Sequence, residues 1–312
     1  MRFEGMPVQQ HGRARPNELM RMRFDLLAGA GAAPLAPAMR APAVLVFDSG
    51  LGGLTVLAEV RRARPDARVV YAADDAAFPY GDLSEPALVA RVVAVMERLI
   101  ALHAPDLVVV ACNTATTLVL PALRARFAIP FVGTVPAIKP AAAATRSGLI
   151  SVLATPGTVR RDYTRELIDA YAGAYAVTLV GATRLAAFAE AELAGTPVGD
   201  DLLREEIAPC FVGAGESRTD VVVLGCTHYP LLLRRFERLV PWPVTWIDPA
   251  PAIARRMAQL LGPAPHPAPP EDAAPVAAVF TGGERITPSL RDALAARGMG
   301  SIAVEAMPLA RQ

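Results

Sequence analysis

The feature that most constrains the fold is a strand-like run that ends in a cysteine, and it occurs twice. The chain reads VVVACNTATT at 108–117 and VVVLGCTHYP at 221–230. In each copy an Asp stands six residues before the Cys, and hydrogen-bonding residues follow the Cys. A continuous apolar run of this kind is typical of a strand buried on both faces of a parallel sheet. We therefore expect Cys112 and Cys226 to lie at equivalent strand ends of two related units.

Each Cys-bearing unit is preceded by a strand, a polar turn and a helix. The first of these openings is VLVFDSGLGG, in which a β-branched run stops at Asp48 and Ser49. The second is GLISVLATPGTV, whose polar turn carries Thr155 and Thr158. This alternation predicts an α/β fold with two similar halves, each a doubly wound parallel sheet. In such sheets ligands bind at the carboxyl ends of strands, where all four turns fall.

The order of the units sets the expected domain boundaries. Residues 43–137 together with 245–312 are predicted to form the half that carries Cys112. Residues 138–244 are predicted to form the half that carries Cys226. In this scheme the last strands of the chain rejoin the first half.

Residues 1–42 stand apart from this pattern. They contain LLAGAGAAPLAPA after two arginines, which faintly resembles an export signal, but the segment is rich in Gly, Ala and Pro rather than Leu. We expect either a disordered leader or a start codon placed too far upstream, with Met39 as the alternative start.

Composition excludes several classes of protein. Hydrophobic residues make up 53% of the 312 residues, which is enough for full cores and too much for a disordered chain. The formal net charge is +1, so the chain lacks the basic excess of proteins that bind nucleic acid. No apolar run approaches the roughly 20 residues that cross a bilayer. Three cysteines without a CxxC spacing argue against a disulfide scaffold and favour a reducing cytoplasm.

The two turn cysteines are the strongest candidates for chemistry. A free thiol has a pKa near 8.5 and is mostly protonated at neutral pH. Each Cys is expected to begin a helix, whose N-terminal dipole favours the thiolate and makes it a usable base or nucleophile. His228 follows Cys226 by two residues and is placed to orient or assist that thiol. Cys210 lacks such a setting and is interpreted as structural.

Oxygen-bearing side chains at the four turns complete the predicted site. Asp48 puts a carboxylate at the tip of the first strand, where it also suits a helix N-cap. The hydroxyl groups together form a polar floor for a small, charged ligand. They belong to Ser49, Thr114, Thr155, Thr158 and Thr227.

Two other kinds of site are disfavoured by spacing. The stretch DSGLGGLT is neither a GxGxxG in register nor a P-loop, because no GK[ST] follows, so nucleotide binding is not expected. A Cys-x-His pair within one turn and a distant second Cys match no usual zinc spacing. We therefore expect no metal.

Several motifs, in order, resemble those of the glutamate racemase family, part of the aspartate/glutamate racemase superfamily. They are FDSGLGGLTVL, FPYG, ACNTAT, LATPGTV and GCTHYPLL, and the similarity runs from about residue 43 to residue 312. The resemblance implies an isomerase with two pseudo-symmetric α/β domains and the active site between them. It implies a cofactor-independent racemase, with no PLP and no metal, that supplies D-glutamate for peptidoglycan synthesis in the cytoplasm. Glutamate is then the expected partner, and nucleic acid and membrane are not. The oligomeric state varies in this family, and a homodimer is one of the assemblies that the resemblance allows.

The resemblance also assigns roles to residues. Cys112, with Asp48 near it, exchanges the α-proton of D-glutamate, and Cys226, with His228 near it, exchanges that of L-glutamate. One thiolate removes the proton from one face while the opposite thiol returns a proton on the other. The substrate contacts that it implies are Asp48, Ser49, Tyr80, Gly81, Asn113, Thr114, Thr155, Thr158 and Thr227.

The chain departs from the family pattern in two places. Asp82-Leu83-Ser84 follows the PYG motif, where many relatives have a basic residue before the Ser. The segment 178–195 lacks the Cys and Pro that many relatives carry before an acidic motif. Both departures concern contacts to the substrate side chain, and neither touches the thiol pair.

Three alternatives remain open from the sequence. An aspartate racemase of the same superfamily would keep both thiols. A Cys-His hydrolase would use Cys226 and His228 and would leave Cys112 without a role. A non-enzymatic, partner-binding protein would keep its function after both thiols are replaced.

Overall fold

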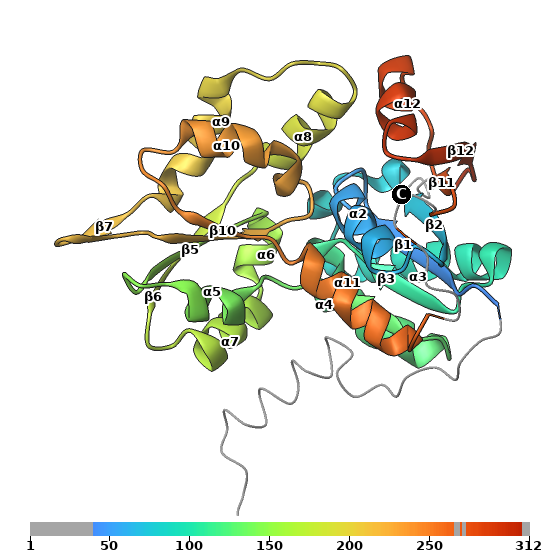
Figure 1. The fold of residues 1–312 in the computed structure, drawn as a ribbon, viewed down its shortest axis with the longest axis horizontal. Helices are drawn as coiled ribbons and strands as arrows, with labels where there is room; N and C mark the ends of the chain where they lie inside the picture. Colours follow the sequence, from blue (N-terminus) through green and yellow to red (C-terminus); the bar gives the residue numbers. More distant parts are fainter. Residues whose placement is uncertain (1–39, 265–268, 270–272, 308–312) are drawn as a thin grey trace, which may run out of the picture.

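Two lobes, each built on its own parallel sheet, make up the chain in the computed structural model (Figure 1). The structure describes residues 40–264, 269 and 273–307, so almost all of the predicted leader at 1–42 lies outside it. The predicted class, α/β with two parallel-sheet units, is confirmed. Within the described residues no helix has both the length and the apolar character that crossing a bilayer requires.

The first sheet has its strands in the order β12-β11-β2-β1-β3-β4, all parallel. Its strands are β1 (Ala43–Asp48), β2 (Arg68–Ala73), β3 (Leu107–Val110), β4 (Phe131–Gly133), β11 (Val276–Phe280) and β12 (Met299–Val304). Its α-helices are α2 (Leu54–Ala63), α3 (Glu85–His103), α4 (Asn113–Arg126), α11 (Ala250–Leu261) and α12 (Pro288–Ala295). The strand order reverses at β1, where a crevice opens at the carboxyl end of the sheet.

The second sheet has the order β10-β9-β5-β6, again all parallel. Its strands are β5 (Leu149–Ala154), β6 (Ala176–Gly181), β9 (Val221–Gly225) and β10 (Thr245–Ile247). Its α-helices are α5 (Ile138–Ala144), α6 (Pro156–Arg160), α7 (Asp162–Tyr171), α8 (Leu185–Leu193), α9 (Asp200–Ile207) and α10 (Leu233–Leu239). Here the order reverses at β5, so the two polar turns of this lobe also meet at one edge.

Short elements complete the described chain. An antiparallel pair, β7 (Gly213–Ala214) and β8 (Ser217–Arg218), is exposed. The 3₁₀ helices are η1 (Asp75–Ala77), η2 (Tyr80–Asp82), η3 (Ala208–Cys210) and η4 (Tyr229–Leu232). Cys210, predicted on a helix and interpreted as structural, lies fully buried at the end of η3.

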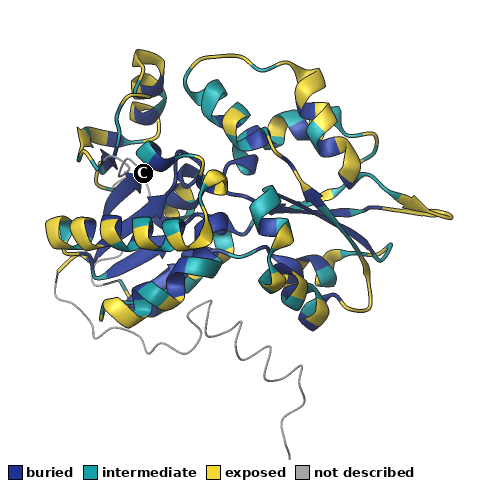
Figure 2. Ribbon diagram, turned by 180° about the vertical axis from the view of Figure 1, so that it is seen from behind, coloured by how far each residue is buried: buried dark blue, intermediate teal, exposed yellow. Residues whose placement is uncertain are grey.

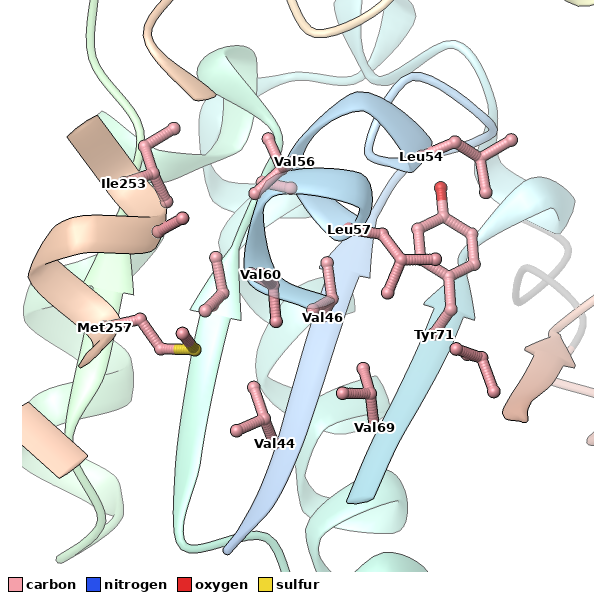
Figure 3. Close-up of a cluster of buried hydrophobic side chains, with 14 of the residues drawn as sticks. Val44, Val46, Leu54, Val56, Leu57, Val60, Val69, Tyr71, Ile253 and Met257 are labelled. Carbon is pink, nitrogen blue, oxygen red and sulfur yellow. The ribbon is translucent and has the colours of Figure 1, made fainter. Parts of the chain in front are cut away.

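The alternation of side chains along β1 explains why helices cover both faces of the first sheet. Val44 and Val46 point to the face covered by α2 and α11, and Leu45 and Phe47 point to the face covered by α3 and α4. Figure 3 shows the first of these cores, where Met257 of α11 packs near the strands. Both faces are apolar, so β1 and β3 are buried along their full length and the centre of this sheet is dark blue in Figure 2. Burial on two faces fixes the strand ends from which the site is built.

The structure divides the C-terminal stretch differently from the expected boundary at 245. Strand β10 pairs with β9 and therefore extends the second sheet. The helix that follows it, α11, packs against α2 of the first lobe. The chain thus returns to the first lobe after β10, because the apolar face of α11 completes the core over β1. The domain boundaries as a whole stay a prediction.

Candidate active site

A cavity of about 240 Å³ lies where the polar turns of the two lobes meet, and it is lined by residues from both. Most of the residues predicted from sequence line it. These are Ser49, Tyr80, Gly81, Cys112, Asn113, Thr114, Thr155, Cys226, Thr227 and His228. Asp48 and Thr158 do not line it, because both are buried behind its wall. The two cysteines that sequence spacing paired therefore share one enclosed space.

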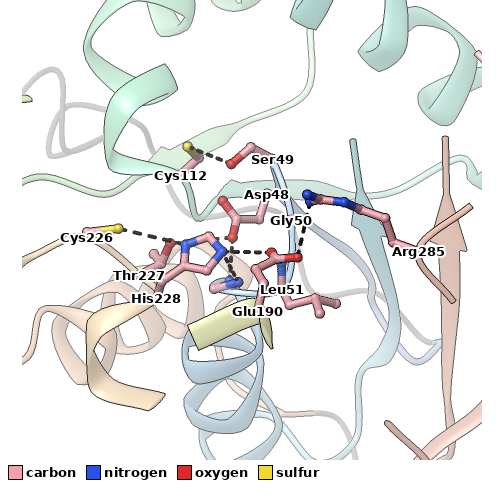
Figure 4. Close-up of polar contacts among 12 residues, drawn as sticks. Asp48, Ser49, Gly50, Leu51, Cys112, Glu190, Cys226, Thr227, His228 and Arg285 are labelled. Carbon is pink, nitrogen blue, oxygen red and sulfur yellow. Dashed lines mark hydrogen bonds and ion pairs between the residues drawn. The ribbon is translucent and has the colours of Figure 1, made fainter. Parts of the chain in front are cut away.

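Cys112 lies between the end of β3 and the start of α4, where it is the N-cap residue. Its Sγ lies 3.5 Å from the Oγ of Ser49 (Figure 4). Burial, together with the charge of Asp48, raises the pKa of the Cys112 thiol far above its ordinary value. The sequence predicted the opposite direction from the helix dipole. Desolvation outweighs the dipole here, since the thiol is almost completely enclosed.

Asp48 ends β1 and is completely buried. Its Oδ2 accepts a 2.6 Å hydrogen bond from the N–H of Gly53 and a 3.4 Å bond from the hydroxyl of Thr227 in the other lobe. Its Oδ1 has no hydrogen-bond partner among the described residues. Burial raises the pKa of this carboxyl group, although the charge of His228 opposes the rise. A buried acceptor without a partner suits a cationic group of a ligand.

Cys226 follows β9, and its surroundings differ from those of Cys112. The expected helix does not start at this residue: a turn and the 3₁₀ helix η4 come first, and α10 begins only at Leu233. Pro230 in this stretch favours a helix start and removes a backbone donor. The helix-dipole argument therefore fails at Cys226. The group beside it is the imidazole of His228, whose Nδ1 lies 3.8 Å from the sulfur.

His228 is held on its other side by a residue that sequence reasoning missed. Its Nε2 lies 2.9 Å from Oε1 of Glu190 on α8. Burial alone would lower the pKa of His228, but hydrogen bonds to Cys226 and Glu190 and nearby negative charges raise it well above the ordinary value. The imidazole is thus favoured in its charged form, facing the sulfur of Cys226 on one side and the carboxylate of Glu190 on the other.

Two contacts compete for Nε2 of His228. The N–H of Gly52 points at this nitrogen from 3.1 Å, a hydrogen bond only when Nε2 carries no proton. The contact with Glu190 requires that proton. Because the pKa of His228 is raised, we assign the proton to Nε2 and the hydrogen bond to Glu190. A side chain at position 52 would collide with this ring, since an added Cβ would lie 2.4 Å from Nδ1.

Glu190 also joins the two lobes. Its Oε1 accepts a 2.7 Å hydrogen bond from the N–H of Leu51 in the first lobe. Its Oε2 lies 3.6 Å from the guanidinium of Arg285, which stacks over the ring of Phe78 at 4.8 Å. Figure 4 shows these groups converging on His228 from both lobes. The segment 178–195 was noted in the sequence only as a departure from the family pattern, and nothing local signalled that Glu190 would meet a histidine far along the chain.

Hydroxyl groups bridge the lobes on the opposite wall. The hydroxyls of Thr114 and Thr155 lie 3.2 Å apart, and Thr155 lies 3.0 Å from the buried hydroxyl of Thr158. Asn113, beside them, has both side-chain polar atoms buried without a partner among the described residues. An unpartnered amide at the start of a helix is suited to a carboxylate.

Other residues of the cavity were not predicted. Phe78, Asp82, Arg160 and Thr183 also line it, although none of them was among the predicted site residues. The part of the chain that the structure describes contains no cluster of three or more His, Cys, Asp or Glu side chains suited to a metal ion.

Comparison with known proteins identifies the family of this chain. A family model described as Asp/Glu/Hydantoin racemase matches residues 54–257. The chain belongs to this family. The resemblance inferred from the sequence motifs is thereby confirmed.

The similar proteins narrow the comparison to glutamate racemases. The glutamate racemase of Brucella anthropi is 59% identical over 221 residues, which cover 70% of this chain and 80% of that protein. That of Brucella ovis is 56% identical over 237 residues, covering 75% of this chain and 85% of that protein.

The similar solved structures are also glutamate racemases. Escherichia coli glutamate racemase, in complex with L-glutamate and the activator UDP-MurNAc-ala, superposes with a TM-score of 0.76 at 43% identity, covering 85% of this chain and 98% of that one. A glutamate racemase isoform from Bacillus anthracis gives 0.69 at 27% identity, covering 86% and 98%.

Proposed function

We propose that this protein racemises glutamate by transferring protons between the substrate and two thiols, Cys112 and Cys226. The observation that carries the proposal is that both cysteines, one from each lobe, line the same cavity of about 240 Å³. The relatives named above are glutamate racemases, and the E. coli enzyme was solved with L-glutamate. The protein is therefore an isomerase, an amino-acid racemase that acts on glutamate.

Conversion of L-glutamate begins at Cys226. In the resting protein the proton of this thiol has already passed to Nδ1 of His228, so a thiolate lies beside an imidazolium whose Nε2–H is held by Glu190. The thiolate of Cys226 then removes the α-proton and becomes a thiol again. Cys112 donates its own proton to the opposite face of the planar carbanion and is left as a thiolate. Exchange of protons with solvent after product release returns the enzyme to its starting state.

Conversion of D-glutamate runs in reverse and must begin with a Cys112 thiolate. Burial raises the pKa of this thiol, and the negative charge of Asp48 adds to that effect. The ammonium group of a bound amino acid would counter both effects, because it brings a positive charge into the cavity, next to the wall behind which Asp48 is buried. Ser49, 3.5 Å from the sulfur, would donate a hydrogen bond to the thiolate once it forms. Substrate binding thus helps to activate the base on this side.

The carbanion needs hydrogen-bond donors that are in place before the proton moves. Asn113 lies at the first turn of α4, and its amide has no partner among the described residues. The N-terminus of this helix adds backbone N–H groups and a positive dipole end. We assign the α-carboxylate of the substrate to this position, with the hydroxyls of Thr114 and Thr227 beside it. There the negative charge that develops on the carboxylate is stabilised.

The same arrangement supports a reaction without a cofactor. Two thiols supply both proton transfers, and the helix N-terminus supplies the stabilisation that PLP would otherwise provide. By the family resemblance, the product D-glutamate serves peptidoglycan synthesis. The cytoplasmic location and the homodimer stay predictions.

Proton exchange in deuterated water tests the proposal. Purified protein is given D- or L-glutamate separately, without PLP or added metal, and the product is followed by NMR and chiral chromatography. We expect deuterium at the α-carbon of the inverted product from either enantiomer. Exchange with aspartate alone would instead support an aspartate racemase, and hydrolysis of a carboxylic derivative without any exchange would support a Cys-His hydrolase.

A further inference from the structure

A second cavity of about 440 Å³ adjoins the one that holds the thiols. We call it the vestibule, and it is bordered by Gly81, Glu85, Thr117, Gly157, Arg160 and Arg161, among others. Gly81, Gly157 and Arg160 line both cavities, so the two are neighbours with a common wall. Nothing in the proposed proton transfer uses the vestibule.

Most charged groups of the vestibule are already paired. Arg161 forms an ion pair with Glu85, which connects α3 to the other lobe. Asp162 forms a 3.6 Å ion pair with Arg165. Arg160 is exposed and takes part in no ion pair or hydrogen bond with a described residue. Its guanidinium is thus the charge that the vestibule leaves open to a ligand.

Within the described chain, Arg160 is an unpaired positive charge in the thiol cavity too, because its side chain lines both cavities. Among the described residues that line the thiol cavity, Asp82 and Arg160 are the fully charged side chains besides His228. Glutamate carries a net negative charge, so Asp82 repels it while Arg160 attracts it. Thr117, also at the vestibule, keeps a buried hydroxyl oxygen without a partner among the described residues. A guanidinium and an unpartnered hydroxyl that line the same cavity suit a carboxylate.

We propose that Arg160 receives the side-chain carboxylate of the substrate in the vestibule and thereby selects amino dicarboxylates for the thiol cavity. This inference rests on the proposed racemase activity and names the residue that favours its substrate class. The α-carboxylate then faces Asn113 in the thiol cavity, and the ammonium group lies on the side where Asp48 is buried behind the cavity wall. Arg160 contributes to capture and specificity and takes no part in the chemical step.

The test compares substitutions of Arg160 with a matched control. R160Q removes the charge, R160K keeps it without the forked guanidinium, and R165Q makes the same charge change five residues away at a side chain that lines neither cavity. For R160Q we expect KM for both enantiomers to rise about three- to tenfold, with kcat within twofold of the wild type. R160K should recover part of the loss, and R165Q should behave as the wild type.

Two further measurements separate capture from a general effect of charge. Raising the salt concentration should raise KM for the wild type and R165Q more than for R160Q, since screening removes what the substitution has already removed. Inhibition by glutarate, a dianion, should weaken more in R160Q than inhibition by glutaramate, its monoanionic amide.

Several outcomes would overturn the proposal. An unchanged KM in R160Q, or an equal rise in R165Q, would show that Arg160 does not receive the substrate. A fall in kcat at constant KM would place Arg160 in the turnover step instead. Failure of the racemase assignment would be seen separately, as wild-type protein that does not racemise glutamate. Titration of that protein with glutarate would still report whether Arg160 binds a dicarboxylate.

Discussion

The two thiols of the cavity lie in equivalent turns but have neighbours of opposite character. Cys112 has a neutral hydroxyl beside it and the buried carboxylate of Asp48 behind, and its pKa is raised by burial. Cys226 has an imidazole beside it, and Glu190 stabilises that imidazole in its charged form. A two-base racemase needs one thiolate and one thiol at any moment. Under the proposed two-thiol mechanism, this difference predicts a resting protein that accepts L-glutamate, with Cys112 as the proton donor.

Replacing either thiol should have the largest effect. We expect C112S and C226S each to lower kcat/KM by about 10³-fold or more in both directions, because a hydroxyl is a far weaker acid and base. Circular dichroism of D- and L-glutamate solutions follows the rate. C210S is the matched control, since Cys210 is buried outside the cavity. Racemisation within tenfold of the wild-type rate in C112S would contradict the role of Cys112 as an acid and base.

Substitution of Asp48 or His228 should distinguish proton transfer at Cys112 from proton transfer at Cys226. We expect D48N and H228N each to lower kcat/KM about 10²-fold, equally in both directions, since the equilibrium constant of a racemisation is one. A difference between the two thiols should instead be measured as exchange of the α-proton with solvent in substrate that has not been inverted. H228N should keep exchange of D-glutamate better than that of L-glutamate, and D48N the reverse. If both variants exchanged the same enantiomer faster, Asp48 and His228 would not each assist a different thiol.

The free energy of unfolding should depend on pH through the protonation of His228. Since the folded-state pKa of His228 is raised, the folded protein binds this proton more tightly than the unfolded chain does. The stability gained is fully present below about pH 6.5, the ordinary value, and is lost as pH rises through the folded-state pKa. E190Q should therefore cost about 1–2 kcal/mol at pH 6 and less at pH 9.5.

Urea unfolding of wild type and E190Q at the two pH values measures this difference. The amide oxygen that E190Q introduces can still accept the hydrogen bond from Leu51, so the loss reports the charge next to His228. A difference in free energy of unfolding that does not change with pH would mean that His228 is neutral in the folded state.

Substitution of Arg285 should have the smallest effect on activity, and it should act only through Glu190 and His228 beside Cys226. It lies 3.6 Å from Glu190 and over Phe78, whose ring is 5.5 Å from that of His228. Because half of its side chain is exposed, water screens its charge. We expect R285M to lower kcat about two- to threefold, with R291M, on α12, as a control that leaves kcat unchanged. An effect as large as that of H228N would contradict this ranking.

The pairing of Cys112 with Cys226 could be predicted because it follows from local patterns. A strand buried on both faces, a polar turn and a helix leave the turn at the carboxyl end of the sheet, and the pattern occurs in both halves. The pKa of Cys112 could not be predicted, because desolvation depends on what closes over the thiol. The start of the helix after Cys226 was placed too early because Pro230 and the turn before it were not weighed.

Long-range contacts account for the other differences. Glu190 meets His228 only because α8 and the turn after β9 come together across the second sheet. Strand β10 joins β9 rather than the first lobe, a choice that depends on which sheet edge is open and not on its own sequence. Asp48 and Thr158 were placed at the right turns, but side-chain direction and packing put them behind the cavity wall.

A crystal structure of the protein with bound D- or L-glutamate tests the central claim most directly. The account predicts that the α-carbon lies within about 4 Å of the sulfur of Cys112 on one face and of Cys226 on the other, as proton transfer requires. A substrate whose α-carbon meets only one of the two sulfurs, or both from the same face, would contradict it.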